Sequence, residues 1–398
     1  MVKASKSYIR GFGGEEFVKL KNYQITLVDR LSSAHLVGGD TIQIQALNRF
    51  LQENNYETNI TNNVNENTTN TDLFILFNLT NAQELFYHFD HIKVSGIPYI
   101  IFPIYWDLDS VIPLNAYIGP RRYIKKIFPE SSLHILRNII FYIHNRKLLK
   151  LQINNLLAWN KYAKKVKEIL NNSCFICVNS HSEAEHLVKK FPLSQEAEKR
   201  IKVIRNGIDK SELKMPLSID ELRGQNFLCC IGGIGPRKNQ IMLVRAANEL
   251  KINLVLVGNS SKDNMSYYNK LKKEAGPTIK FLGHLSHSEA KGIMAASKGL
   301  LQPSYIETPG LAAMEAYSLG VPIAVSDTGP VREYFGDTAL YCDPSDIDSI
   351  KAVMTRLLSQ DIAQRLNVEF IEKYQWSSVF SPLLEPINSI VSKPKSIY

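Results

Sequence analysis

The chain has 398 residues, of which 44% are hydrophobic and 21% are charged, with a formal net charge of +9. This length and composition suit a globular protein with two domains of ordinary size. No stretch reaches the ~20 consecutive apolar residues of a transmembrane helix. The first 25 residues carry charges throughout and lack an apolar core, so we expect no signal peptide and a cytoplasmic protein.

The five cysteines do not form a metal or redox motif. Cys174 and Cys177 form a C-x-x-C pair within an apolar run typical of a buried strand, and no second ligand pair accompanies them. We expect the cysteines to be reduced residues of the core.

Short apolar runs alternate with helical stretches along the chain, which is typical of parallel α/β sheets. In the first half, we predict strands at 24–30, 72–79, 98–104, 174–180 and 202–208, with helices at 39–55 and 181–191. In the second half, we predict strands at 227–233, 253–259, 279–285, 299–304, 321–327 and 339–344. The Asn- and Thr-rich stretch 54–71 predicts a surface connection. These patterns favour two Rossmann-like domains joined near residues 208–222.

One glycine-rich turn, "CIGGIGPRKNQ" at 230–240, leaves a strand and enters a helix. Such a turn lets backbone N–H groups approach an anion at the N-terminus of a helix. Arg237 and Lys238 add the positive charge that a diphosphate requires. A plain loop would also fit this pattern.

A second candidate is "YIETPGLAAMEAYSLGVPIAVSD" at 305–327. We expect a helix to begin near Gly310, with the amides of Gly310 and Leu311 at the carboxyl ends of the strands, where ligands of open α/β sheets bind. Glu307 is expected on the lip of that crevice, and Glu315 one to two turns into the helix. One carboxylate could accept hydrogen bonds from sugar hydroxyls and the other from ribose hydroxyls. Alternatively, Glu315 bonds a neighbouring backbone group or an arginine.

The stretch "PSYIETPGLAAMEAYSLGVPIAVSDTGPVREYFGD" resembles the donor-site signature of family 4 retaining glycosyltransferases of the GT-B fold. Further stretches resemble the same family in the same order: "FICVNSHSEAEHL", "VIRNGID", "GGIGPRKNQ", "IKFLGHLSHSE" and "YQWSS". The resemblance implies an acceptor-side domain at 1–208, a donor domain at 209–373, a cleft between them, and a C-terminal helix at 374–398 that crosses back to the first domain.

The resemblance also implies the roles of individual residues. Lys238 and Arg237 would meet the diphosphate of a UDP- or GDP-linked sugar, Glu307 the transferred sugar, and Glu315 the ribose. The remaining donor-side positions that it implies are Gly233, His284, Leu285, Thr308, Gly310 and Leu311. It implies a retaining transfer that requires neither a metal ion nor another cofactor.

The chain departs from this family at two places. Gly233 stands where relatives commonly carry an arginine, and Trp106-Asp107 stands where many carry a His-Asp pair that faces the reacting sugar. Gly38, Gly39 and Asp40 remain well placed to approach phosphate and acceptor across the cleft. Asp107-x-Asp109 and Asp346-x-Asp348 superficially resemble a D-x-D metal motif, but we interpret both as structural.

The positive charge is concentrated in one segment, 110–168. It holds twelve Lys and Arg, including Arg121, Arg122, Lys125 and Lys126, against Glu130 and Glu168. With the apolar stretch 133–157, which we read as a helix, it predicts contact with an anionic membrane surface. A solvated basic face or a protein interface fits equally well. No recognition-helix or RNP pattern supports nucleic-acid binding.

The sequence thus predicts a cytoplasmic glycosyltransferase, peripheral on the membrane, that moves a sugar from a nucleotide sugar to a glycan, lipid-linked or protein acceptor. A nucleotide-sugar epimerase or a phosphorylase on the same fold is an alternative enzyme. A non-catalytic scaffold protein is another alternative: Trp106 in place of a histidine favours it, whereas Glu307, Glu315 and Lys238 argue against it.

Overall fold

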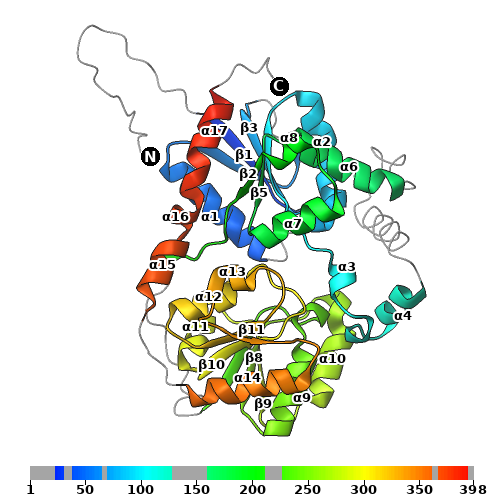
Figure 1. Ribbon diagram of the computed structural model, residues 1–398, viewed down its shortest axis with the longest axis vertical. Coiled ribbons are helices and arrows are strands. Elements are labelled where there is room, and N and C mark those ends of the chain that lie inside the picture. The colour runs from blue at the N-terminus through cyan, green and yellow to red at the C-terminus, as the bar shows by residue number, and fades with distance from the viewer. Residues whose placement is uncertain are drawn as a thin grey trace, which may run out of the picture.

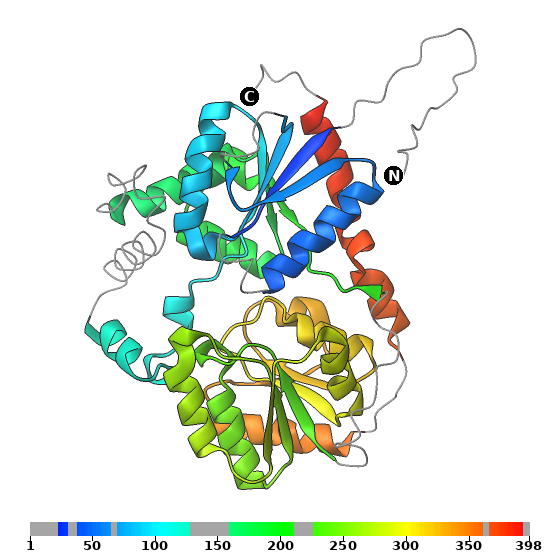
Figure 2. The same ribbon diagram turned by 180° about the vertical axis from the view of Figure 1, so that it is seen from behind.

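The computed structural model describes residues 23–30, 38–64, 70–127, 159–210, 226–360 and 366–392. These residues form two lobes stacked along the long axis of the molecule, each built around a sheet with helices on both faces (Figures 1 and 2). The stretch 133–157, where a helix was expected, and most of the expected domain junction lie outside the described residues.

The first sheet has six parallel strands in the order β2-β1-β3-β4-β5-β6. Its strands are β1 (Gln24–Val28), β2 (Glu57–Thr61), β3 (Leu73–Phe77), β4 (Tyr99–Phe102), β5 (Phe175–Val178) and β6 (Ile201–Val203). All five strands predicted in this half are confirmed. The prediction of a surface connection at 54–71 was wrong in part, because β2 lies within that stretch. Among the described strands β2 lies at the edge of the sheet and pairs with β1, and four of its five residues are exposed or half-buried, which fits its polar sequence.

The second sheet is also parallel and six-stranded, in the order β12-β11-β10-β7-β8-β9. Its strands are β7 (Leu228–Ile231), β8 (Leu254–Val257), β9 (Ile279–Gly283), β10 (Gly299–Gln302), β11 (Ile323–Ser326) and β12 (Leu340–Cys342). The six predictions for this half are confirmed. β7, β8, β10 and β11 are buried along their whole length, which explains why their sequences are continuous apolar runs.

Helices connect the strands. Between β1 and β6 these are α1 (Gly39–Glu53), α2 (Ala82–Ser95), α3 (Leu108–Val111), α4 (Pro120–Ile127), α6 (Trp159–Asn172), α7 (His181–Lys190) and α8 (Gln195–Glu198); of these, α4 lies beside the second lobe (Figure 1). In the second lobe they are α9 (Gln240–Leu250), α10 (Met265–Glu274), α11 (His287–Ala296), α12 (Leu311–Ser318), α13 (Val331–Phe335) and α14 (Ile347–Ser359). The chain then forms α15 (Val368–Tyr374), α16 (Trp376–Phe380) and α17 (Leu384–Val391).

The strand orders determine where ligands can bind. Counted from β7, the second sheet has the order 3-2-1-4-5-6 of a dinucleotide-binding fold. The strands are parallel throughout, and the order in which the chain adds them reverses between β7 and β10. In the first sheet the switch falls between β1 and β3. Open α/β sheets bind ligands outside the carboxyl ends of the strands at such a switch point. The loops after β7 and β10 are therefore the candidate site in the second lobe.

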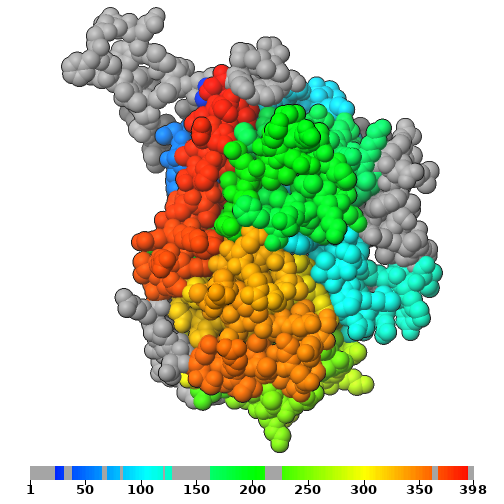
Figure 3. Space-filling view, viewed as in Figure 1, coloured from blue at the N-terminus to red at the C-terminus, as the bar shows by residue number. Residues whose placement is uncertain are grey.

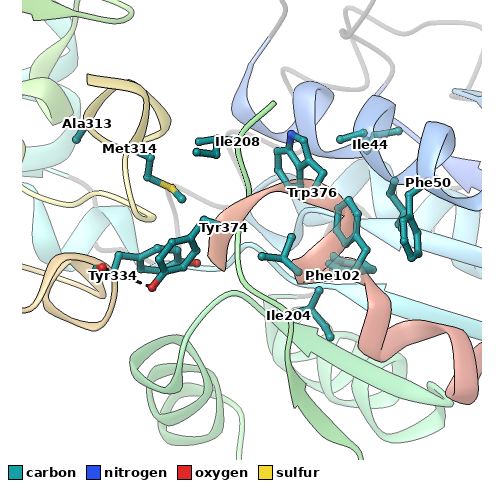
Figure 4. Close-up of a cluster of buried hydrophobic side chains, with 14 of the residues drawn as sticks. Ile44, Phe50, Phe102, Ile204, Ile208, Ala313, Met314, Tyr334, Tyr374 and Trp376 are labelled. Carbon is teal, nitrogen blue, oxygen red and sulfur yellow. Dashed lines mark hydrogen bonds between the residues drawn. The ribbon is translucent and has the colours of Figure 1, made fainter. Parts of the chain in front are cut away.

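The C-terminal helices return to the first lobe, where they form one flank of it (Figure 3). The ring of Phe380 lies 5.7 Å from that of Phe50 on α1, and the Tyr56 hydroxyl lies 2.6 Å from Asn388 Oδ1. A continuous apolar cluster joins the two lobes, with Met314 and Tyr334 from the second, Ile44 from the first, and Trp376 between them (Figure 4).

The cysteine prediction is confirmed, since all five are free thiols and four of them are buried. Within the part of the chain that the structure describes, no helix combines the length and apolar character needed to cross a membrane.

Candidate donor site

Two loops at the switch point of the second sheet are packed closely together. The loop after β7 runs from Gly232 to Lys238, and the loop after β10 runs from Ser304 to Gly310; we call the latter the donor loop. The first of these loops also packs against the chain that follows β8, where a Cβ at Gly258 would approach Gly232 O to 2.1 Å. Gly258 has φ of +136°, so both the contact and the backbone conformation require glycine here.

Glu307 is the centre of the charge arrangement. Its side chain accepts hydrogen bonds from Lys238 Nζ and Ser304 Oγ, both at 2.5 Å, and Arg237 Nη1 lies 3.6 Å away. Burial by itself would raise the pKa of Glu307, but Lys238 and Arg237 outweigh it and hold the pKa below its ordinary value. The carboxylate is therefore ionised, and Lys238 and Ser304 both donate to its Oε1 atom.

The expected position of Glu307 on the lip of the crevice was wrong, because its exposed fraction is 3%. The two cations are more exposed than the carboxylate that they contact: the side chain of Arg237 is 38% exposed and that of Lys238 is 14% exposed. Arg237 also donates to Ile306 O at 3.0 Å. Two positive charges held against one carboxylate leave a net positive charge at the switch point.

Gly310 precedes α12 and has φ of +91°. A Cβ here would lie 2.9 Å from Gln302 Oε1 and 3.5 Å from Glu307 Oε2. Only glycine combines this left-handed backbone with such close packing. In the helix that begins at Leu311, the Ala313 and Met314 N–H groups already donate to Gly310 O, so the amides of Leu311 and Ala312 are the ones that precede the first helical bonds.

Glu315, one turn further into α12, accepts a hydrogen bond from His287 Nε2 at 2.8 Å. Its side chain is 15% exposed. Neither a backbone group nor an arginine is the partner that the structure gives it, and His287 was not among the predicted site residues. Ser286 and Glu289 form a capping box at the start of α11, which fixes His287 in the first turn.

The other predicted donor-side positions lie on loops of the second lobe. His284 is exposed and Leu285 is half-buried in the loop between β9 and α11. Gly233 is exposed, and a Cβ added there would meet only Asn259 O, at 3.9 Å. A larger side chain at Gly233 would thus meet little obstruction at its Cβ. The carbonyl oxygen of Thr308 accepts a hydrogen bond from Asn206 of the first lobe.

The N-terminus of α1 faces the donor site from the first lobe. A Cβ at Gly39 would lie 3.5 Å from Leu311 Cδ1, so the first residues of α1 and α12 meet across the two lobes. Gly38 precedes the helix. Asp40 is held by Arg30 Nε at 2.8 Å and Asn78 Nδ2 at 2.9 Å.

Trp106 and Asp107 are fixed against α7 instead. The Trp106 ring stacks on His186 with centroids 5.0 Å apart, and the Asp107 N–H donates to His186 Nε2 at 3.1 Å. Asp107 also pairs with Lys190 at 2.7 Å. Burial raises the pKa of Asp107, but the bond to Lys190 brings it below its ordinary value.

The acidic pairs do not form a metal centre in the described residues. Asp109 pairs with Lys125 at 2.8 Å, and Asp346 caps α14. No group of three His, Cys, Asp or Glu side chains with a geometry suited to a metal ion occurs in the described ranges. Sequence reasoning missed His186, Asn206, His287 and Gln302, because each makes a contact between segments far apart in the chain. It also missed Ser304, which bonds Glu307 only three residues further on.

Solved structures with the same arrangement show which fold this is. Sucrose-phosphate synthase from Thermosynechococcus elongatus aligns with a TM-score of 0.68 at 14% identity, over 92% of this chain and 99% of that one. Anabaena HepE, solved in complex with UDP and glucose, aligns with a TM-score of 0.61 at 14% identity over the same shares. The chain has the GT-B fold of two Rossmann-like domains.

Residues 217–374 match the family described as glycosyl transferases group 1. O-antigen chain mannosyltransferase B of Escherichia coli is 27% identical over 169 residues, which are 40% of this chain and 44% of that protein. D-inositol 3-phosphate glycosyltransferase of Mycolicibacterium smegmatis is 25% identical over 243 residues, 57% of this chain and 55% of that protein. The chain thus spans about half the length of these curated relatives.

Proposed function

We propose that the protein is a family 4 glycosyltransferase that transfers a sugar, with retention, from a nucleotide-diphosphate sugar to a glycan, lipid-linked or protein acceptor. The observation that carries this proposal is the cluster of Lys238, Arg237 and Glu307 next to the N-terminus of α12, at the switch point of the second sheet. Its net positive charge and free helix amides suit a diphosphate.

In this proposal the second lobe stabilises the leaving group. As the bond between the sugar C1 and the phosphate oxygen breaks, negative charge develops on the diphosphate. Lys238, Arg237 and the first amides of α12 would stabilise that charge. The acceptor oxygen bonds to C1 on the face that the diphosphate leaves, and its proton passes to the departing phosphate oxygen. The scheme needs no metal ion, because these groups supply the positive charge.

The two glutamates have different tasks in this scheme. Glu307 holds Lys238 in place and contacts the transferred sugar, whereas Glu315 accepts hydrogen bonds from the ribose of a UDP- or GDP-linked donor. The acceptor would enter from the first lobe, past Gly39 and Asp40.

A thermal-shift screen with UDP, GDP, ADP, CMP and their common sugar conjugates tests the donor site. A ligand at 100 times its Kd stabilises the native state by ~2.7 kcal/mol. We expect a shift with one nucleotide, and its loss in Lys238→Ala. If wild-type protein shifts with none of them, the proposal is wrong and a non-catalytic scaffold becomes the better interpretation.

The exposed amphipathic helix α4 lies beside α10 of the second lobe, and we propose that it contacts an anionic membrane (Figure 1). Tyr123 and Ile127 of α4 are 67% and 70% exposed, next to the exposed Arg122 and Lys126. Apolar side chains next to cations suit an anionic bilayer surface. Lys125 is not available to lipid, since it pairs with Asp109 and covers the ring of Tyr117.

Sedimentation with vesicles tests this contact. We expect the protein to bind phosphatidylglycerol vesicles and not phosphatidylcholine vesicles, and the double variant Tyr123→Ser, Ile127→Ser to lose most of the binding. Equal sedimentation of variant and wild type would assign the contact to other residues.

A further inference from the structure

The donor loop belongs to the second lobe, yet the first lobe holds it close to both ends. Near its C-terminal end, Asn206 Nδ2 donates a hydrogen bond to Thr308 O at 2.9 Å. Asn206 follows β6 and precedes the crossing to the second lobe, so this bond joins the two lobes directly. Thr308 is adjacent to Glu307, the carboxylate that contacts both Lys238 and Arg237.

Asn206 is itself fixed on several sides. Its backbone N–H donates to the Tyr334 hydroxyl at 2.9 Å, and that hydroxyl donates to Asn179 O at 2.8 Å. The neighbouring Gly207 lies so close to Trp376 that a Cβ there would approach its ring to 2.7 Å. Figure 4 shows Tyr334 next to Tyr374 at this junction of the lobes. Asn206, only 8% exposed, therefore presents its amide to Thr308 in a fixed position.

The other end of the donor loop is held by an apolar contact. Tyr305 is buried in a small cluster with Ile112 and Tyr117, which belong to the segment between β4 and α4. This segment leaves the first lobe and runs down the second lobe to α10 (Figure 1). A Cβ at Gly119 would lie 3.0 Å from Ser266 Oγ, which confirms the close approach to α10.

Movement of the donor loop would move the charged groups with it. Tyr305 N–H donates to Arg237 O at 2.9 Å, and Arg237 Nη1 donates to Ile306 O at 3.0 Å. Glu307 in turn holds Lys238. Any displacement of Tyr305 or Thr308 is thereby transmitted to both cations.

We propose that Asn206 is a positioning residue through which the first lobe sets the geometry of the donor loop, with Ile112 and Tyr117 holding its other end. The charged site is then complete only while the two lobes are together. This inference rests on the proposed function in one respect, namely that the donor loop holds the nucleotide sugar.

Hydrogen–deuterium exchange of the ligand-free full-length protein tests the positioning without any nucleotide. Asn206→Asp keeps the size of the side chain and removes the N–H donor, so amides of Ser304–Gly310 should exchange about fivefold faster, as expected for the loss of one hydrogen bond. Ile112→Ala should speed exchange at Tyr305 and Ile306. Asn206→Ala is the second variant, should the aspartate prevent folding.

Glu333→Gln is the matched control. Glu333 also joins the lobes, accepting from the N–H groups of His181 and Ser182 at 2.9 and 2.8 Å, and its other partners, the Ser182 hydroxyl and Arg205, also lie outside the donor loop. This variant should speed exchange at residues 181–184 and leave Ser304–Gly310 unchanged. If the donor loop exchanges no faster in Asn206→Asp than in Glu333→Gln, the positioning role is wrong.

A second readout separates positioning from general stability. With UDP or GDP, whichever stabilises the wild type, Asn206→Asp should weaken binding about fivefold while Glu333→Gln leaves the affinity unchanged. Equal affinities in the two variants would overturn the proposal. A wild type that binds neither nucleotide would overturn the proposed function instead, and the exchange data would still decide whether Asn206 positions the loop.

Discussion

Lys238 Nζ and Glu307 Oε1 lie 2.5 Å apart although the two residues are 69 positions apart in the chain. The pair joins the loop after β7 to the loop after β10. Glu307 is buried, whereas Lys238 is the more exposed partner. Because the two partners differ in burial, replacing Lys238 and replacing Glu307 should lower the free energy of unfolding by different amounts.

Removal of Lys238 should be the more destabilising change. Lys238→Met leaves a buried carboxylate short of its closest cation, so we expect a loss of about 3 kcal/mol in the free energy of unfolding. Glu307→Gln should cost less, because Lys238 can turn toward water. The double variant should recover part of the Lys238→Met loss. Urea denaturation of the four proteins measures this cycle, and strictly additive losses would contradict a direct coupling.

Glu183 predicts a pH dependence of stability. It is fully buried, and burial raises its pKa to about 7 even though the N–H groups of Asn179 and Tyr105 donate to it. The folded-state pKa lies above the unfolded value of about 4.3, so the folded protein binds the additional proton. The stability that this group contributes is therefore complete below about pH 4 and is lost as pH rises through about 7.

Glu183→Gln provides the measurement. The difference in free energy of unfolding, wild type minus variant, should fall by about 3 kcal/mol between pH 4 and pH 8, since one pKa unit corresponds to about 1.4 kcal/mol. Glu333→Gln is the control, because Glu333 binds the first N–H groups of α7, the helix that contains Glu183. A difference that stays constant over this range would show that Glu183 keeps an ordinary pKa.

The His287–Glu315 pair tests the ribose assignment. If Glu315 accepts hydrogen bonds from the ribose, Glu315→Gln should weaken nucleotide binding at least tenfold, because it removes a charged acceptor. His287→Ala should have a smaller effect, since it leaves the carboxylate in place. Isothermal titration with the nucleotide found in the screen gives both values. An unchanged Kd in Glu315→Gln would refute the assignment.

Tyr334 should be important for the stability of the junction. Its hydroxyl accepts from Asn206 N and donates to Asn179 O, so Tyr334→Phe leaves two buried backbone groups without this partner. We expect a loss of about 2 kcal/mol or more in the free energy of unfolding. Tyr374→Phe is a close control, because its hydroxyl lies 3.4 Å from Tyr334 O and makes a much weaker bond. Equal losses in the two variants would contradict the bridging role.

The fold was largely predictable because the physics involved is local. Strands such as β7 and β10 are buried on both faces, and their continuous apolar sequences identify them. β2 was missed for the opposite reason: an exposed edge strand carries no apolar signal, and only its pairing with β1 makes it a strand.

The sequence by itself determined that two glycine-containing loops follow two buried strands, and that cations and carboxylates lie on them. Their partners were decided only by the tertiary structure. Glu307 pairs with Lys238, Glu315 accepts a hydrogen bond from His287, and Asn206 of the first lobe donates to the carbonyl oxygen of Thr308. Local sequence sets which residue types a loop offers, but the free energy of a buried charge depends on neighbours that only the packing of distant segments supplies.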